Sequence, residues 1–169
     1  MKIDDLEKIK FIDNSRLNFN HGLSRLNWFN IGGKSKIYLF ANSLKDLSLF
    51  LKIYNNRGKI FILGAGSNTL FDDGVFEGAI IKLGKNFNNI KLRKNFLSVG
   101  AGVLDLNLAK FATKNSIKDF EFFNGIPGTI GGAIKMNAGC YGSQTSDNLK
   151  RVLIINQYGK LKYLNNNEL

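Results

Sequence analysis

Two glycine-rich segments with very few charged side chains constrain this sequence most. They are LGAGSNTLF (63–71) and FFNGIPGTIGGAIKMNAGCYG (122–142). The stretches 61–71 and 122–134 contain no charged residue, although 22% of the chain is charged. Glycine permits positive φ and close approach of a ligand to the backbone, and successive amides in such turns form anion sites. The two segments therefore predict a site where backbone amides, helped by Ser67, Asn68 or Thr129, hold a pyrophosphate without a lysine.

Neither segment matches a familiar nucleotide-binding loop. A Walker A loop places Lys and Ser or Thr after its glycines, whereas Ser67 and Asn68 follow Gly66 here. A Rossmann fingerprint requires a third glycine where Thr69 stands and an acidic residue about 20 positions further on. Both classes are excluded, and the alternative that the glycines only form tight turns stays open.

The hydrophobic pattern predicts an α+β fold with two lobes. A helix is expected from its N-cap Ser43 to a stop at Gly58, and a second over 104–115. Expected strands cover 36–41, 59–63 (buried), 79–83, 90–93 and 96–99, with a hairpin over 152–156 and 160–164. Residues 1–27 are interpreted as a lead-in or N-terminal helix, 28–84 as a small βαβ lobe, and 85–169 as a larger lobe with a mixed sheet.

Composition and charge limit the kinds of protein to which this sequence can belong. The 169 residues carry a formal net charge of +11, and the densest basic stretch, 82–94, lacks any nucleic-acid motif, so a solvated basic face is favoured. No apolar run is long enough to span a bilayer, and the N-terminus has no secretory pattern. One cysteine, Cys140, and one histidine, His21, exclude an internal disulfide and a His/Cys zinc site. We therefore expect a cytoplasmic protein without membrane insertion, nucleic-acid binding or a bound metal.

Three stretches carry a resemblance to a known family. NWFNIGGKSKIYLFANS (27–43), LGAGSNTLFDDGVFEGAIIKL (63–83) and GIPGTIGGAIKMNAGCYG (125–142) resemble the UDP-N-acetylenolpyruvoylglucosamine reductase (MurB) family. This family belongs to the FAD-binding superfamily that includes vanillyl-alcohol oxidase. The resemblance runs from about residue 26 to 169 and implies a two-lobed, PCMH-type FAD-binding fold.

The resemblance also implies an activity. Members bind FAD non-covalently, oxidise NADPH and reduce UDP-N-acetylglucosamine-enolpyruvate to UDP-N-acetylmuramate, a peptidoglycan precursor used in cell wall biogenesis. The implied partners are thus NADPH and a UDP-sugar. Two alternatives stay open: another FAD-dependent oxidase of the superfamily, and a non-catalytic module that binds nucleotides or nucleic acid.

The cofactor-binding residues implied by the resemblance form three groups. The first would line the pyrophosphate and ribose, the second the other side of FAD, and the third the flavin and the substrate entrance. In order, they are Leu63, Gly64, Ala65, Gly66, Ser67, Asn68, Thr69 and Leu70; Gly125, Ile126, Pro127, Gly128, Thr129, Gly131, Gly132 and Ala133; and Asn137, Gly139 and Tyr141. A valine at Gly131 is expected to abolish cofactor binding more than folding, with an added penalty if Gly131 is left-handed.

The catalytic Arg, Ser and Glu of the family belong to segments after the position of Leu169. No catalytic residue is therefore predicted within this chain, which resembles the FAD-binding half of the reductase and is not expected to turn over substrate alone. A separate C-terminal fragment would then be a partner.

Four single residues outside these assignments complete the expectations. His21 and Cys140 are expected to pack rather than to react, and Glu121 to hold the second segment by accepting backbone N–H bonds. Lys135 is equally compatible with a diphosphate contact and with an exposed turn.

Overall fold

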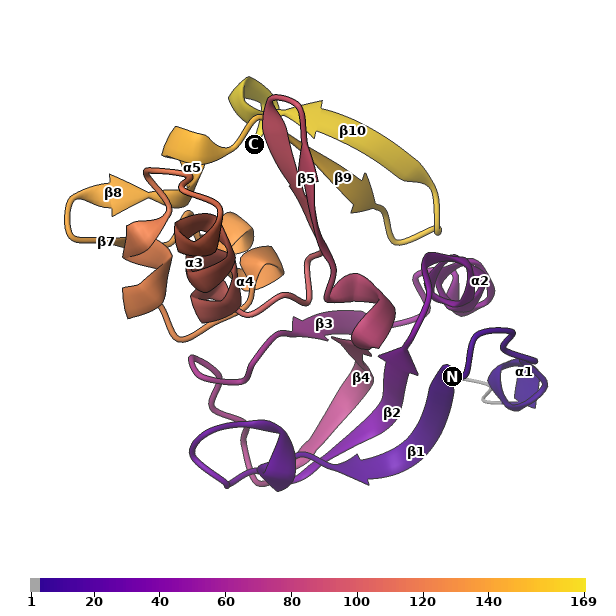
Figure 1. Cartoon of the computed structure of the whole chain (residues 1–169). Coiled ribbons are helices and arrows are strands. Elements are labelled where there is room, and N and C mark those ends of the chain that lie inside the picture. The colour runs from indigo at the N-terminus through magenta and orange to yellow at the C-terminus, as the bar shows by residue number, and fades with distance from the viewer. Residues whose placement is uncertain (1–3) are drawn as a thin grey trace.

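The computed structural model describes residues 4–169, and its N-terminal half is built on a mixed four-stranded sheet (Figure 1). The strands lie in the order β1 (Arg16–Gly22), β2 (Lys34–Ala41), β4 (Val75–Leu83) and β3 (Lys59–Leu63). β1 pairs antiparallel with β2, whereas β2, β4 and β3 are parallel to one another. The carboxyl ends of the three parallel strands therefore meet at one end of the sheet, where ligands of open α/β sheets bind.

The crossover from β2 to β3 is the helix α2 (Leu44–Tyr54). Ser43 begins it as predicted, since its hydroxyl oxygen accepts a hydrogen bond from the N–H of Asp46 at 3.1 Å. The predicted stop at Gly58 was wrong. The helix ends three residues earlier at Asn55, whose φ of 47° is left-handed, because Asn tolerates this region better than most residues.

The two faces of the sheet pack against different layers, because side chains alternate along β2 and β4. α2 and the short helix α1 (Asp4–Glu7) lie on one face. The core there comprises Leu6, Ile37, Leu39, Ala41, Leu47, Phe50, Leu51, Tyr54, Ala79 and Ile81. The opposite face carries a smaller core of Leu23, Tyr38, Leu63 and Ile80, surrounded by Leu26, Phe40, Phe71 and Phe76. The loops of this second face form the candidate site.

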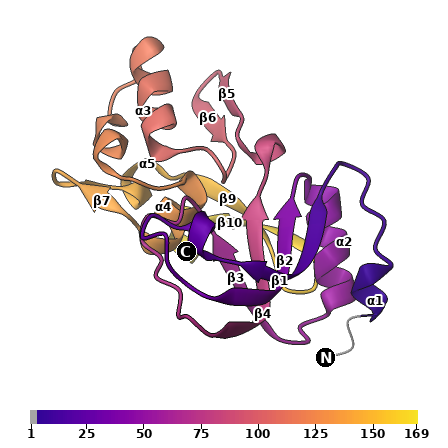
Figure 2. The same cartoon turned by 90° about the horizontal axis from the view of Figure 1, so that it is seen from below.

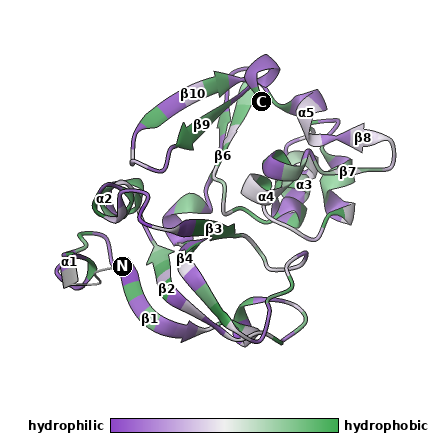
Figure 3. Ribbon diagram, turned by 180° about the vertical axis from the view of Figure 1, so that it is seen from behind, coloured by the Kyte–Doolittle hydropathy of each residue, from purple (hydrophilic) through white to green (hydrophobic). Residues whose placement is uncertain are grey.

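β3 is less buried than its sequence indicates. Figure 3 shows it as strongly hydrophobic, yet Phe61 is 37% and Ile62 57% exposed. The buried strand predicted over 59–63 is thus wrong in its burial, because β3 is the edge strand and has β4 as its one neighbour in the described sheet.

Residues 85–169 form three hairpins and three helices (Figures 1 and 2). Residues 90–140 contribute to a separate core, whereas Ile155 packs against the first core and the Ser48 hydroxyl of α2 donates to the Gly159 carbonyl at 2.8 Å. The elements are β5 (Ile90–Arg93), β6 (Phe96–Val99), α3 (Asp105–Lys114), α4 (Ile130–Met136), β7 (Gly139–Cys140), β8 (Ser143–Gln144), α5 (Thr145–Asn148), β9 (Arg151–Ile155) and β10 (Leu161–Asn165). Short 3₁₀ turns are η1 (Ser24–Leu26), η2 (Lys85–Phe87), η3 (Glu121–Gly125) and η4 (Asn166–Glu168). The core is Val103, Leu108, Ala109, Phe122, Phe123, Ile130 and Ala133.

The predicted α+β fold is confirmed, with three corrections. Residues 1–27, expected as a lead-in or helix, contribute the strand β1 to the first sheet. The second glycine segment, expected as loop, contains η3 and α4, because Thr129 caps a helix at this point. The expected larger sheet of the second lobe is replaced, within residues 85–169, by separate hairpins, since each strand pairs antiparallel with its neighbour along the chain.

The division into two lobes at residues 84 and 85 stays a proposal. It is supported by the core of Val103 and Phe122, which draws on residues 90–140 alone. No helix of the described chain is long and apolar enough to cross a membrane.

Candidate functional site

The structure brings the two glycine-rich segments together at the carboxyl end of β3. Gly64 begins the first loop directly after this strand, and a Cβ on it would lie 2.7 Å from the hydroxyl oxygen of Thr129. Three residues further along, the Ser67 hydroxyl donates a hydrogen bond to the carbonyl of Pro127, 60 positions away in the sequence. The residues predicted to share one site from two distant segments are therefore in contact.

A third loop, residues 23–33, packs against the first loop from the other side. The Trp28 N–H donates to the Gly66 carbonyl at 3.0 Å. Gly66 is buried and has φ = 74°, and a Cβ there would lie 2.3 Å from the Leu26 carbonyl oxygen. Only glycine fits this position. The buried Asn27 shapes the loop, since its amide donates to the carbonyls of Leu23 (3.1 Å) and Ile31 (2.8 Å).

The free hydrogen-bond donors of the site lie in the first loop. In the part of the chain that the structure describes, none of the backbone N–H groups of residues 64–70 makes a hydrogen bond to protein. The loop at the start of α4 differs, because its amides are engaged: Ile130 donates to Val103, Gly131 to Ala101 and Gly132 to the Thr129 hydroxyl. The first loop therefore has the capacity to bind an anion, and the second loop supports it.

Gly131 differs from the expectation. It lies in α4 and is not among the glycines with positive φ, so the left-handed penalty does not apply. A Cβ at this position would lie 3.0 Å from the Ala101 carbonyl oxygen, which accepts the Gly131 N–H. A valine would push α4 away from residue 101, so it would disturb the packing of the second lobe as well as any ligand.

Two charged residues that the sequence interpretation did not assign to the site lie behind the loops. Lys82, near the end of β4, donates from Nζ to the carbonyl of Gly64 at 2.7 Å. Its side chain is half-buried, and burial lowers the pKa of its ammonium group. No sequence signal indicates this contact, which depends on the register of the sheet: Lys82 pairs with Leu63, the last residue of β3, so the two strand ends are adjacent.

The second charged residue is Asp105, the first residue of α3. It is fully buried, and its N–H donates to the Gly128 carbonyl at 3.2 Å. Neither carboxyl oxygen has a hydrogen-bond partner within residues 4–169, and burial raises the pKa of this group to about 7. A Cβ on Gly128 would lie 2.6 Å from Oδ2, so the absence of a side chain at Gly128 makes room for this carboxyl.

The third group of predicted site residues lies at the C-terminal end of α4 and in the β7–β8 hairpin. Asn137 ends α4 with φ = 42°, and its side chain bonds Gln144 and Ser146, so it shapes this turn. Gly139 pairs with Gln144, and Tyr141 is 91% exposed. A Cβ on Gly125 would lie 3.3 Å from the Tyr141 ring, which places this group next to the second loop.

The remaining predicted residues occupy different environments. Leu63 and Ala133 are core residues, which hold the loops rather than line a surface. Ala65, Thr69, Ile126 and Gly128 are half-buried, and Asn68, Leu70, Gly125, Pro127 and Gly132 are exposed.

Of the four single residues, His21 packs as expected. Its ring stacks on Tyr38 with 4.2 Å between ring centroids. Cys140 is half-buried against the second core, and Lys135 is exposed. The role expected for Glu121 is not found, because it is exposed and accepts no hydrogen bond from residues 4–169.

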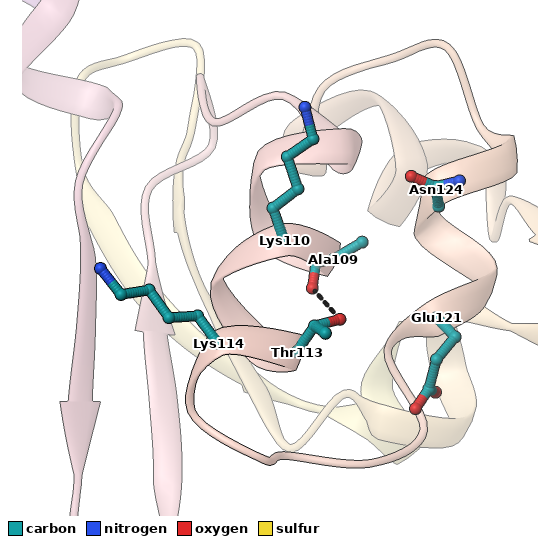
Figure 4. A pocket seen from close by; sticks show the side chains of 6 residues that line it. All are labelled: Ala109, Lys110, Thr113, Lys114, Glu121 and Asn124. Atoms are coloured by element: carbon teal, nitrogen blue, oxygen red, sulfur yellow. Dashed lines mark hydrogen bonds between the residues drawn. The ribbon is translucent and has the colours of Figure 1, made fainter.

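A shallow pocket elsewhere has no part in this site. It has a volume of about 470 Å³ and is lined by Ala109, Lys110, Thr113 and Lys114 of α3 and by Glu121 and Asn124 of η3 (Figure 4). Lys110 and Lys114 point away from each other, and none of the six residues is a predicted site residue.

The loops at the strand ends have the free backbone donors and close contacts that are typical of a domain for a phosphate-bearing cofactor. The chain belongs to the FAD binding domain family, whose model matches residues 35–165. The donors fit FAD, since a diphosphate needs free N–H groups and close backbone approach, which residues 64–70 provide.

The chain is also similar in sequence to curated enzymes that share one name. The chain is 46% identical over 162 residues to the UDP-N-acetylenolpyruvoylglucosamine reductase of Pelagibacter ubique (strain HTCC1062), covering 95% of this chain and 54% of that protein. It is 43% identical over 150 residues to the enzyme of the same name from Rickettsia typhi (strain ATCC VR-144 / Wilmington), covering 89% and 51%. The chain thus spans about half the length of the curated relatives it matches. The resemblance inferred from the sequence is confirmed.

Solved structures agree in fold. The crystal structure of UDP-N-acetylenolpyruvylglucosamine reductase (MurB) from Thermus caldophilus matches with a TM-score of 0.76 at 26% identity, covering 92% of this chain and 54% of that one. 6-Hydroxy-D-nicotine oxidase from Arthrobacter nicotinovorans matches with a TM-score of 0.63 at 17% identity, covering 92% and 36%. The second likeness shows the shared fold alone, and this fold is the FAD-binding architecture expected from the sequence.

Proposed function

We propose that this chain is the FAD-binding part of a UDP-N-acetylenolpyruvoylglucosamine reductase. The observation that carries the proposal is the contact between the 64–70 loop, with its free backbone N–H groups, and the 126–129 loop. The 46% identity to a reductase of this name along nearly the whole chain supports the same substrate class. Because the chain spans about half of such relatives, substrate reduction is proposed for the whole enzyme.

In this proposal the chain's residues bind and orient the cofactor. The N–H groups of residues 64–70 donate to the diphosphate, and Gly64 and Gly66 keep side chains out of its path. The hydrogen bond from Ser67 to the Pro127 carbonyl holds the second loop against the first, and the exposed Tyr141 would face the flavin. Bound FAD would supply hydride transfer from NADPH to the enolpyruvyl group of the UDP-sugar.

The groups that stabilise charge on the substrate are proposed to come from outside residues 1–169. An enolate forms when hydride reaches the double bond, and it requires preorganised donors and a proton source. The family's Arg, Ser and Glu follow the position of Leu169. A cytoplasmic location and NADPH as reductant stay parts of the proposal.

The test is a titration of the chain with FAD, followed by quenching of flavin fluorescence. We expect saturable one-to-one binding and full release of the flavin into the supernatant after acid precipitation. Absence of saturable binding would refute the proposal, whereas flavin retained on the precipitated protein would refute the non-covalent attachment.

Two further measurements address the alternatives. Rapid reoxidation of the reduced, bound flavin by O₂ would favour an oxidase of the same superfamily. Steeply salt-dependent DNA binding without flavin binding would favour the nucleic-acid module.

A further inference from the structure

The strongest unexplained feature of the site is the lysine behind the first loop. Lys82 lies on the same face of the sheet as Ile80, and its neighbours in register are Phe40 on β2 and Leu63 on β3. Its aliphatic stem therefore rises through apolar surroundings to the end of the sheet. There the ammonium group meets the carbonyl of Gly64, at the residue where the strand becomes the loop.

Within residues 4–169 this ammonium group forms no ion pair with a carboxylate. The ion pairs of the described chain join Lys36 to Glu77, Arg57 to Asp5 and Lys162 to Glu168, and Lys82 takes part in none of them. An ammonium group has three N–H donors, and the Gly64 carbonyl is the one acceptor found for Lys82 within residues 4–169. A half-buried charge without a counter-ion is costly, so its retention at this point needs a reason.

The same place also holds the unused backbone donors. Lys82 bonds the carbonyl of Gly64, and the N–H groups of residues 64–70, which begin at this same residue, make no hydrogen bond within residues 4–169. An anion bound by the loop would supply both with acceptors and would give Lys82 its counter-charge. Residues 61–71 contain no carboxylate, and none of the ion pairs found within residues 4–169 involves Lys82.

We propose that Lys82 is a cofactor-binding residue, whose ammonium group, placed by its hydrogen bond to the Gly64 carbonyl, balances the charge of the cofactor diphosphate. The site then has the lysine that the neutral loops lack, supplied from the neighbouring strand rather than from within the loop. This inference rests on the proposed function, because it takes FAD as the diphosphate-bearing ligand.

The test compares FAD affinity and apo stability among four proteins: the wild-type chain, Lys82→Met, Lys82→Arg and the matched control Lys85→Met. Lys85 belongs to the same basic stretch but is exposed in η2. Lys82→Met removes a charge-assisted hydrogen bond to the cofactor, and the loss of its contribution to the binding free energy should weaken FAD binding about 10- to 100-fold. Lys82→Arg should retain most of the affinity, and Lys85→Met should change it less than about twofold. The dissociation constants come from flavin fluorescence, so no turnover is needed.

Thermal unfolding without FAD distinguishes a role of Lys82 in binding the ligand from a role only in stabilising the fold. If Lys82 serves the ligand, Lys82→Met should unfold at or above the wild-type temperature, because the substitution removes a desolvated charge. Unchanged FAD affinity in Lys82→Met would overturn the proposal, and so would a weakened affinity that comes with a lowered apo unfolding temperature. Failure of the wild-type chain itself to bind FAD would instead overturn the proposed function, and this inference with it.

Discussion

Replacing the buried carboxyl of Asp105 should change how stability depends on pH. Asp105 is fully buried, its two carboxyl oxygens have no partner among residues 4–169, and burial raises its pKa from 3.8 to about 7. A group whose pKa is raised on folding stabilises the protein fully below its unfolded pKa and loses that contribution as pH rises through the folded pKa. With these two values, the wild-type chain should lose about 2.5 kcal/mol of stability from this group between pH 5 and pH 8.

The variant Asp105→Asn cannot ionise and should not show this loss. The assay is urea unfolding followed by circular dichroism at pH 5, 6, 7 and 8, with Asp73→Asn as an exposed control. We expect the stability of Asp105→Asn relative to wild type to rise by about 2 to 3 kcal/mol from pH 5 to pH 8. The free energy of unfolding of the control Asp73→Asn should change with pH as that of the wild type does. Parallel curves for Asp105→Asn as well would show that Asp105 has an ordinary pKa and a partner, which would refute the reasoning.

Two further substitutions test the contact between the two loops of the site and the hydrogen bonds that stabilise the first sheet and its helix. Gly64→Ala should weaken FAD binding about tenfold in a fluorescence titration, because its Cβ would lie 2.7 Å from the Thr129 hydroxyl and separate the two loops. Gly74→Ala, with no atom within 4 Å of its Cβ, should bind FAD as wild type does, and equal affinities in both variants would contradict the close contact. Asp46→Ala should cost about 2 to 4 kcal/mol in urea unfolding at pH 7, since the buried carboxylate accepts hydrogen bonds from Ile12 (2.9 Å), Asp13 (3.0 Å) and Ser15 (2.7 Å). Burial raises the pKa of Asp46, but the hydrogen bonds lower it by more, so the net shift is downward. The stabilisation by this carboxylate should therefore be present above pH 3.8 and be lost as pH falls through the lowered pKa. A destabilisation by Asp46→Ala that is the same at pH 7 and at pH 2 would contradict this reasoning.

The sequence by itself determined the helices over 43–54 and 104–115, most strands of the first sheet and the two segments of the site, whereas it did not predict β1 or α4. Short-range patterns specify these features: Ser43 caps a helix through a residue three positions away, and the residues of 104–115 repeat with helical spacing. The glycine segments were also recognisable without a structure, because the absence of charge and the order of the motifs are properties of the chain alone. The same motifs identified the FAD-binding family that the comparisons confirm.

Only the tertiary structure decided which groups meet. Lys82 reaches Gly64 because β4 pairs in parallel with β3 in one register, and Ser67 reaches Pro127 across 60 residues. Neither contact follows from local periodicity, since both depend on how distant segments pack. The same packing separates the glycines by role: Gly66 needs positive φ, whereas Gly128 leaves space for the Asp105 carboxyl. In the sequence, Lys82 lies within the basic stretch 82–94 and Asp105 within the predicted helix 104–115. Their burial beside the loops arises from the fold, because a charged side chain loses solvent only when other elements close over it.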